Sequence, residues 1–119
     1  MRRLGIVLVA SIAAAGAAGA TTAAPAQYVL HGSVAPGHIT LKNGLGRPYL
    51  HGRRGLYRIS VTDSSSTDDF RLVGPGVDVV ITGTAFVGAH AVQVTLARGT
   101  YRYLSDAHRA LMRGSFTVA

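Results

Sequence analysis

The chain has 119 residues, 48% of them hydrophobic, and contains neither cysteine nor tryptophan. Without cysteine it cannot be a disulfide-stabilised scaffold or a lipoprotein anchored through a cysteine. Twelve Lys and Arg residues against five Asp give a formal net charge of +7, which favours an anionic partner.

The N-terminus has the pattern of a secretory signal peptide. Met1-Arg2-Arg3 is followed by an uncharged apolar run from Leu4 that becomes rich in Ala, Gly and Thr. We therefore predict that residues 1–26 are a signal peptide, cleaved after Ala20 or after Ala26, with the second site preferred. An uncleaved membrane anchor is the alternative, and the Ala- and Gly-rich composition of the run disfavours it.

The mature chain, residues 27–119, has the size of one small domain. A chain of 93 residues buries only about 60–65% of its unfolded surface. Since disulfides are absent, stability must come from a regular apolar core, which favours a two-layer architecture. Removal of Arg2 and Arg3 leaves a net charge of +5.

Along this chain, short segments of alternating apolar and polar residues recur about every ten residues, which is typical of an antiparallel β-sandwich or barrel. Glycine-rich turns separate them, such as Asn43-Gly44 and Gly74-Pro75-Gly76. Residues 28–40 are predicted to be irregular or a first strand. The clearest later strand segments are residues 39–42, 57–61, 70–72, 77–81, 92–96, 101–103 and 116–118.

Two connections differ from the turns. Residues 63–69 are all polar, and we predict a solvated loop there. A calcium site is not expected, because Asp63, Asp68 and Asp69 lack the alternate-residue spacing of a calcium-binding loop. The segment from Ser105 to Met112 is the only helical candidate, and it allows at most two turns.

The order and spacing of several short motifs resemble the small secreted cupredoxins, the plastocyanin- and azurin-like blue-copper proteins. The resemblance covers about Gly55 to Val118 and implies a Greek-key β-sandwich with the metal-site loops at one end. The motifs are Asp68-Asp69-Phe70-x-Leu72-x-Gly74-Pro75-Gly76-Val77, Tyr101-x-Tyr103-x-Ser105-Asp106-x-His108 and Met112-x-Gly114-x-Phe116-x-Val118.

The resemblance also implies a degenerate copper site. In this family a His, a Cys, a second His and usually a Met hold copper. Met112 and His108 match the Met and the second His, but Ser105 stands at the position of the Cys and Asp68 at that of the first His. A serine hydroxyl stays protonated at neutral pH and is a poor ligand for a soft ion, so type-1 copper electron transfer is disfavoured.

Two functions remain open. The first is a non-catalytic binding or structural module at the cell envelope, without a cofactor, whose positive charge attracts an acidic envelope component or protein. In this reading His108 lies at the rim and Met112 closes the top of the core. The second is a metal-handling protein that binds copper or zinc weakly through His108, Met112 and Asp68, with His51 or His90 as an additional ligand.

Other functions are disfavoured. Ser105, Asp106 and His108 are too close in sequence to form a catalytic relay, and no Gly-x-Ser-x-Gly motif is present, so an enzyme is not expected. The arginines are scattered and no aromatic platform accompanies them, which argues against nucleic-acid binding. The oligomeric state does not follow from the sequence.

Overall fold

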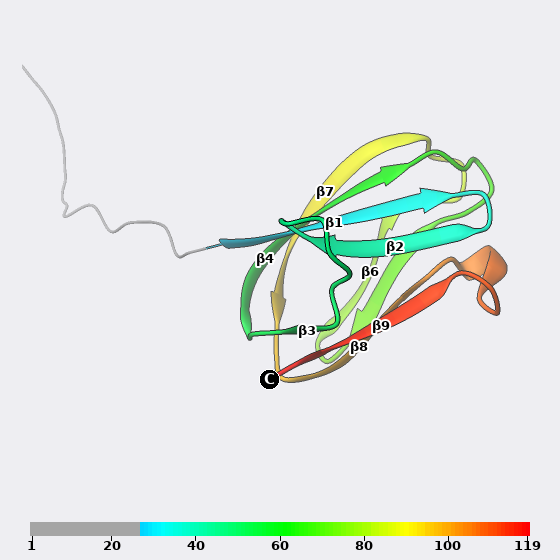
Figure 1. Ribbon diagram of the computed structural model, residues 1–119. Coiled ribbons are helices and arrows are strands. Elements are labelled where there is room, and N and C mark those ends of the chain that lie inside the picture. The colour runs from blue at the N-terminus through cyan, green and yellow to red at the C-terminus, as the bar shows by residue number, and fades with distance from the viewer. Residues whose placement is uncertain (1–26) are drawn as a thin grey trace, which may run out of the picture.

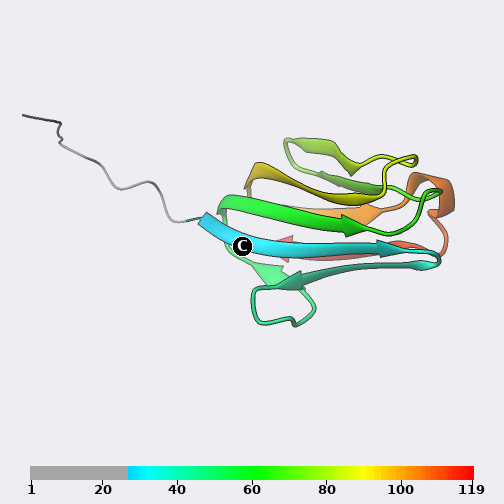
Figure 2. The same ribbon diagram turned by 90° about the horizontal axis from the view of Figure 1, so that it is seen from above.

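The computed structural model describes residues 27–119, so the predicted signal peptide lies outside the described residues. Two β-sheets pack face to face, and one short 3-10 helix lies at one end of the sandwich (Figures 1 and 2). The elements are β1 (Gln27–Ala35), β2 (His38–Asn43), β3 (His51–Gly52), β4 (Gly55–Asp63), β5 (Phe70–Gly74), β6 (Val77–Thr82), β7 (Gly88–Leu96), β8 (Gly99–Leu104), η1 (Asp106–His108) and β9 (Arg113–Val118).

The strand order is β2-β1-β4-β7 in one sheet and β3-β9-β8-β5-β6 in the other. The predicted all-β sandwich is confirmed, but its purely antiparallel pairing is wrong. β1 pairs parallel with β4, and β3 pairs parallel with β9. The reason is that the chain passes through the second sheet at β3 before it returns as β4, and such a crossover lets β4 start at the same end as β1.

Strand β4 shows how the sequence builds the core. Tyr57, Ile59 and Val61 are buried, whereas Arg58 and Thr62 on the opposite face are exposed. Because side chains alternate between the two faces of a strand, all three buried residues point toward the second sheet. The core between the sheets also contains Leu30, Val34, Leu41, Phe70, Leu72, Leu96, Tyr101, Met112 and Phe116.

Stacked aromatic rings of the second sheet pack in the core, and glycines leave space for them. The rings of Phe70 and Tyr103 stack with centroids 5.6 Å apart. A Cβ atom at Gly114 would lie 2.3 Å from the Tyr103 ring, and one at Gly74 would lie 2.1 Å from the Tyr101 ring. These two positions therefore require glycine because the backbone passes directly against a ring.

The sandwich has two distinct ends. Helix η1, the β4–β5 loop and the β8–β9 loop lie at one end, and the start of β1, strand β3 and the end of β9 lie at the other (Figure 1). Within residues 27–119, no helix is long and apolar enough to cross a membrane. The end that carries η1 brings together three of the residues singled out by the sequence, Asp68, Ser105 and His108.

Candidate functional site

Two loops far apart in sequence meet at the η1 end. The first follows β4 and spans residues 64–69, and the second joins β8 to β9 and spans residues 105–112. The second loop closes on itself, because the Ser105 amide donates to the Met112 carbonyl at 3.0 Å and the Met112 amide donates to the His108 carbonyl at 2.8 Å. Its short 3-10 turn, Asp106–His108, agrees with the predicted limit of two helical turns.

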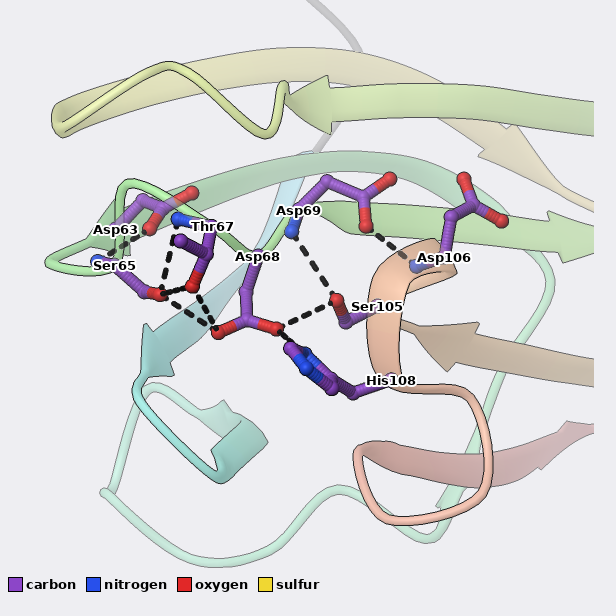
Figure 3. A network of polar contacts seen from close by, with 8 residues as sticks. All are labelled: Asp63, Ser65, Thr67, Asp68, Asp69, Ser105, Asp106 and His108. Atoms are coloured by element: carbon purple, nitrogen blue, oxygen red, sulfur yellow. Dashed lines mark hydrogen bonds and ion pairs between the residues drawn. The ribbon is translucent and has the colours of Figure 1, made fainter.

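The Asp68 carboxylate is the centre of the contacts between these loops (Figure 3). Its side chain is buried, and both oxygens have partners. Oδ1 accepts a hydrogen bond from the Ser105 hydroxyl at 3.0 Å and lies 2.5 Å from Nδ1 of His108. Oδ2 accepts from the Ser65 hydroxyl at 2.6 Å and lies 3.5 Å from the Thr67 hydroxyl.

These contacts determine the protonation of Asp68. Burial alone would raise its pKa, but hydrogen bonds from Ser65, His108 and Ser105 outweigh burial and hold the pKa below its ordinary value. The carboxylate is therefore ionised at neutral pH and can only accept hydrogen bonds. It follows that Nδ1 of His108 carries the hydrogen in this contact.

Ser105 is buried and connects the two loops. Its Oγ donates to Asp68 and accepts the Asp69 backbone amide at 3.3 Å. Because a hydroxyl has one hydrogen and this one is given to Asp68, Ser105 does not donate to His108. Ser105 and His108 both contact Oδ1 of Asp68.

Asp69 makes a second link between the loops. Its Oδ1 accepts the backbone amide of Asp106 at 2.5 Å, and Asp106 in turn pairs with Arg71 and Arg109. Burial, together with the neighbouring Asp106 carboxylate, raises the pKa of Asp69. The two adjacent residues Asp68 and Asp69 thus have pKa values shifted in opposite directions.

The prediction of a solvated loop over residues 63–69 is wrong for its acidic residues. Asp63, Asp68 and Asp69 are all buried, as is Ser65. Hydroxyls and backbone amides of the two loops replace water for most of their oxygens, as in the 2.9 Å bond from the Ser65 amide to Oδ1 of Asp63, whereas Oδ2 of Asp63 is buried without a hydrogen-bond partner. A carboxylate that bonds the backbone two residues later is a recognised turn pattern, and the Asp63-Ser64-Ser65 sequence carried that signal.

Of the other predicted site residues, Met112 shares the loop of His108 and its side chain is buried in the core, whereas the His108 ring is half-exposed at the rim. His51 lies beside Thr117 near the opposite end, with its Nδ1 2.8 Å from the threonine hydroxyl. His90 packs edge-on against Phe86. Within residues 27–119, no three His, Cys, Asp or Glu side chains are grouped so that they could hold a metal ion.

Solved structures of blue-copper proteins have the same fold. Reduced rusticyanin superposes with a TM-score of 0.57 at 18% identity, and the match covers 78% of this chain and 79% of rusticyanin. Auracyanin A, a "blue" copper protein from Chloroflexus aurantiacus, gives a TM-score of 0.53 at 16% identity over 79% of this chain and 100% of its own. No protein-family model and no curated protein matches the sequence. The chain therefore has the cupredoxin fold.

Proposed function

We propose that this protein is a cupredoxin-fold domain in which the Asp68 carboxylate has replaced the copper centre, and that it serves as a non-catalytic binding module outside the cytoplasm. The observation that carries the proposal is that one oxygen, Oδ1 of Asp68, contacts both Ser105 and His108. The resemblance assigns those two positions to the Cys and the second His that hold copper. The carboxylate oxygen thus bridges two side chains that a metal ion would otherwise join.

The donor set does not fit a type-1 copper ion. Such a centre depends on a thiolate, and the chain has no cysteine. The Ser105 hydroxyl gives its hydrogen to Asp68, and a metal ion would have to displace His108 Nδ1 from the same carboxylate. We therefore derive no electron-transfer role through copper for this chain.

The charge distribution supports an anionic partner. Only two of the ten Lys and Arg residues in residues 27–119, Arg71 and Arg109, pair with an acidic side chain there. The remaining basic side chains keep their charge available for a partner. They are Lys42, Arg47, Arg53, Arg54, Arg58, Arg98, Arg102 and Arg113.

Titration of the metal-free protein with Cu(I), Cu(II) and Zn(II) in a calorimeter tests the loss of the metal centre. The proposal predicts no saturable heat that depends on the Asp68 cluster, so the wild-type protein and the Asp68→Asn variant should give the same trace. Tight stoichiometric binding that Asp68→Asn abolishes would show that the carboxylate is a metal ligand and would end the proposal.

One observation favours metal handling as a second candidate. A histidine whose Nδ1 is bonded to a carboxylate has its Nε2 oriented as a metal ligand, and His108 has this arrangement with a half-exposed ring. In this case Asp68 would orient the ligand rather than bind the metal. Weak Zn(II) or Cu(II) binding lost in His108→Ala but retained in His51→Ala would support this candidate, and equal binding by both variants would exclude it.

A further inference from the structure

The acidic residues of this domain are concentrated at one end of the sandwich. Four of the five acidic residues lie in or next to the loops at the η1 end, and most of them are buried or paired. The fifth, Asp78, is held by two hydrogen bonds from Arg71 at 2.8 and 2.9 Å. The acidic residues at the η1 end are Asp63, Asp68, Asp69 and Asp106.

The opposite end carries four exposed arginines, which we call the arginine end. Arg47 lies in the turn after β2, Arg53 and Arg54 join β3 to β4, and Arg98 joins β7 to β8. These connections share one end because β4 starts beside the start of β1, and β2 and β7 run antiparallel to those strands. Within residues 27–119, none of the four pairs with an acidic side chain.

Large apolar side chains are exposed beside these arginines. Leu45, in the same turn as Arg47, is 81% exposed, and Leu50, which follows that turn, is 57% exposed. Tyr28, at the start of β1, is 41% exposed and packs against Tyr57 with ring centroids 5.0 Å apart. Arginine next to exposed leucine and an anchored tyrosine is the composition of surfaces that lie in a membrane interface.

We infer that the arginine end is a docking surface for a bilayer that contains anionic lipids. This inference rests on the proposed function and names its acidic partner. Guanidinium groups would bind headgroup phosphates, and Leu45 and Leu50 would enter the boundary of the acyl chains. A soluble polyanion would use the arginines but would gain nothing from the exposed leucines.

The position of the start of β1 also bears on the inferred membrane docking. The apolar segment of residues 4–20 precedes Gln27, and Gln27 starts β1 at the arginine end (Figure 2). In the alternative in which this segment is an uncleaved anchor, its connection to Gln27 would hold the arginine end toward the same bilayer. The surface and the point of attachment therefore agree in direction.

Cosedimentation with vesicles tests the inference, using both the full chain and the Gln27–Ala119 chain, which contains both sheets and the whole described core. Binding should require phosphatidylglycerol in phosphatidylcholine vesicles and weaken at high salt. Each arginine near the surface contributes about fivefold in affinity, so R53Q/R54Q should lose roughly twentyfold. L45S/L50S should lose about tenfold or more without any change in charge.

Matched controls lie elsewhere on the domain. R102Q/R113Q removes the same charge from exposed positions on β8 and β9, and Leu111→Ser removes an exposed leucine in the β8–β9 loop. Both should bind vesicles within about twofold of wild type, because Leu111 and Arg113 lie at the η1 end and Arg102 lies within β8, so none of them belongs to the arginine end. The inference would be overturned if the control variants lost as much binding as the test variants, or if the protein did not bind anionic vesicles. It would also be overturned if L45S/L50S left binding unchanged and soluble polyphosphate competed fully for the protein.

The two proposals fail separately. Vesicle binding does not depend on metal, and the calorimetric titration does not depend on lipid. If the protein binds metal through Asp68 and still binds anionic vesicles, the proposed loss of the metal centre is wrong and the membrane inference stands. If the protein binds neither metal nor vesicles, only the inference of a membrane partner is wrong.

Discussion

Nδ1 of His108 lies 2.5 Å from Oδ1 of Asp68, and this contact joins loops separated by 40 positions in the sequence. The same oxygen accepts the Ser105 hydroxyl, so a single carboxylate ties the β8–β9 loop to the end of the β4–β5 loop. The Asp68 carboxylate is buried, so the loss of either hydrogen-bond partner would leave a buried charge less well compensated. Asp68 is therefore the residue whose replacement should have the largest effect at this end.

Asp68→Ala should reduce the free energy of unfolding by about 2–3 kcal/mol, because the buried Ser65 and Ser105 hydroxyls lose their charged acceptor. Asp68→Asn, which keeps one acceptor oxygen, should lose less. Urea denaturation followed by circular dichroism measures both. The exposed Asp78→Ala variant is the control and should change stability little, and an Asp68→Ala protein as stable as that control would contradict the assigned role.

The free energy of unfolding should decrease in acid, and protonation of Asp68 should account for part of the decrease. Its folded-state pKa is below the ordinary value, so its contribution is complete above the unfolded-state pKa of about 3.9 and is lost as pH falls through the lower folded-state pKa. Unfolding free energies measured across that range should therefore vary less steeply in Asp68→Asn than in wild type. Parallel pH profiles would show that the carboxylate has an ordinary pKa.

Asp69→Asn should stabilise the protein at neutral pH. Burial and the Asp106 carboxylate raise the pKa of Asp69, so its stabilising contribution is lost as pH rises through the folded-state pKa. An asparagine oxygen would still accept the Asp106 amide without the repulsion between two carboxylates. We expect a gain within about 1 kcal/mol in urea denaturation at pH 7 that disappears in acid. A loss of stability at pH 7 would contradict the raised pKa.

The double variant D68H/S105C should bind Cu(II) and become blue. It supplies an imidazole and a thiolate at the two positions where this chain departs from the cupredoxin pattern, next to His108 and Met112. An intense visible absorption band on addition of Cu(II) is the expected readout, and Ser105→Cys alone should not produce a stable one. A double variant that keeps its circular dichroism spectrum but stays colourless would show that the loops do not retain the geometry of a copper site.

Much of the fold follows from sequence patterns that are local. The alternation at Tyr57, Ile59 and Val61 predicted β4, and the turn residues around Pro75 predicted the break between β5 and β6. Both features depend on periodicity and turn chemistry, which a sequence displays directly. That the loops with Asp68 and His108 share an end was implied by the resemblance to the cupredoxins and by no local pattern.

Other features depend on partners that the sequence does not indicate. The parallel pairing of β1 with β4 is set by a crossover through the other sheet, so no residue of β1 encodes it. Likewise, a run of Ser, Thr and Asp reads as a solvated loop until Ser105 and His108 arrive from a distant loop to satisfy Asp68. Sequence alone identified Asp68, Ser105 and His108, but it missed the Ser65 partner of Asp68 and did not show that these side chains bind one another.

NMR of the His108 ring nitrogens during titration with Zn(II) shows whether the Asp68 carboxylate has taken the place of a metal ion. We expect Nδ1 to carry a hydrogen bonded to the Asp68 carboxylate at neutral pH and to keep it after a stoichiometric amount of Zn(II) is added. Asp68→Asn should move the Nδ1 resonance even without metal. If instead Zn(II) removes the Nδ1 hydrogen and shifts that nitrogen to a metal-bound position, the Asp68 carboxylate has not replaced the metal, and the proposed function is wrong.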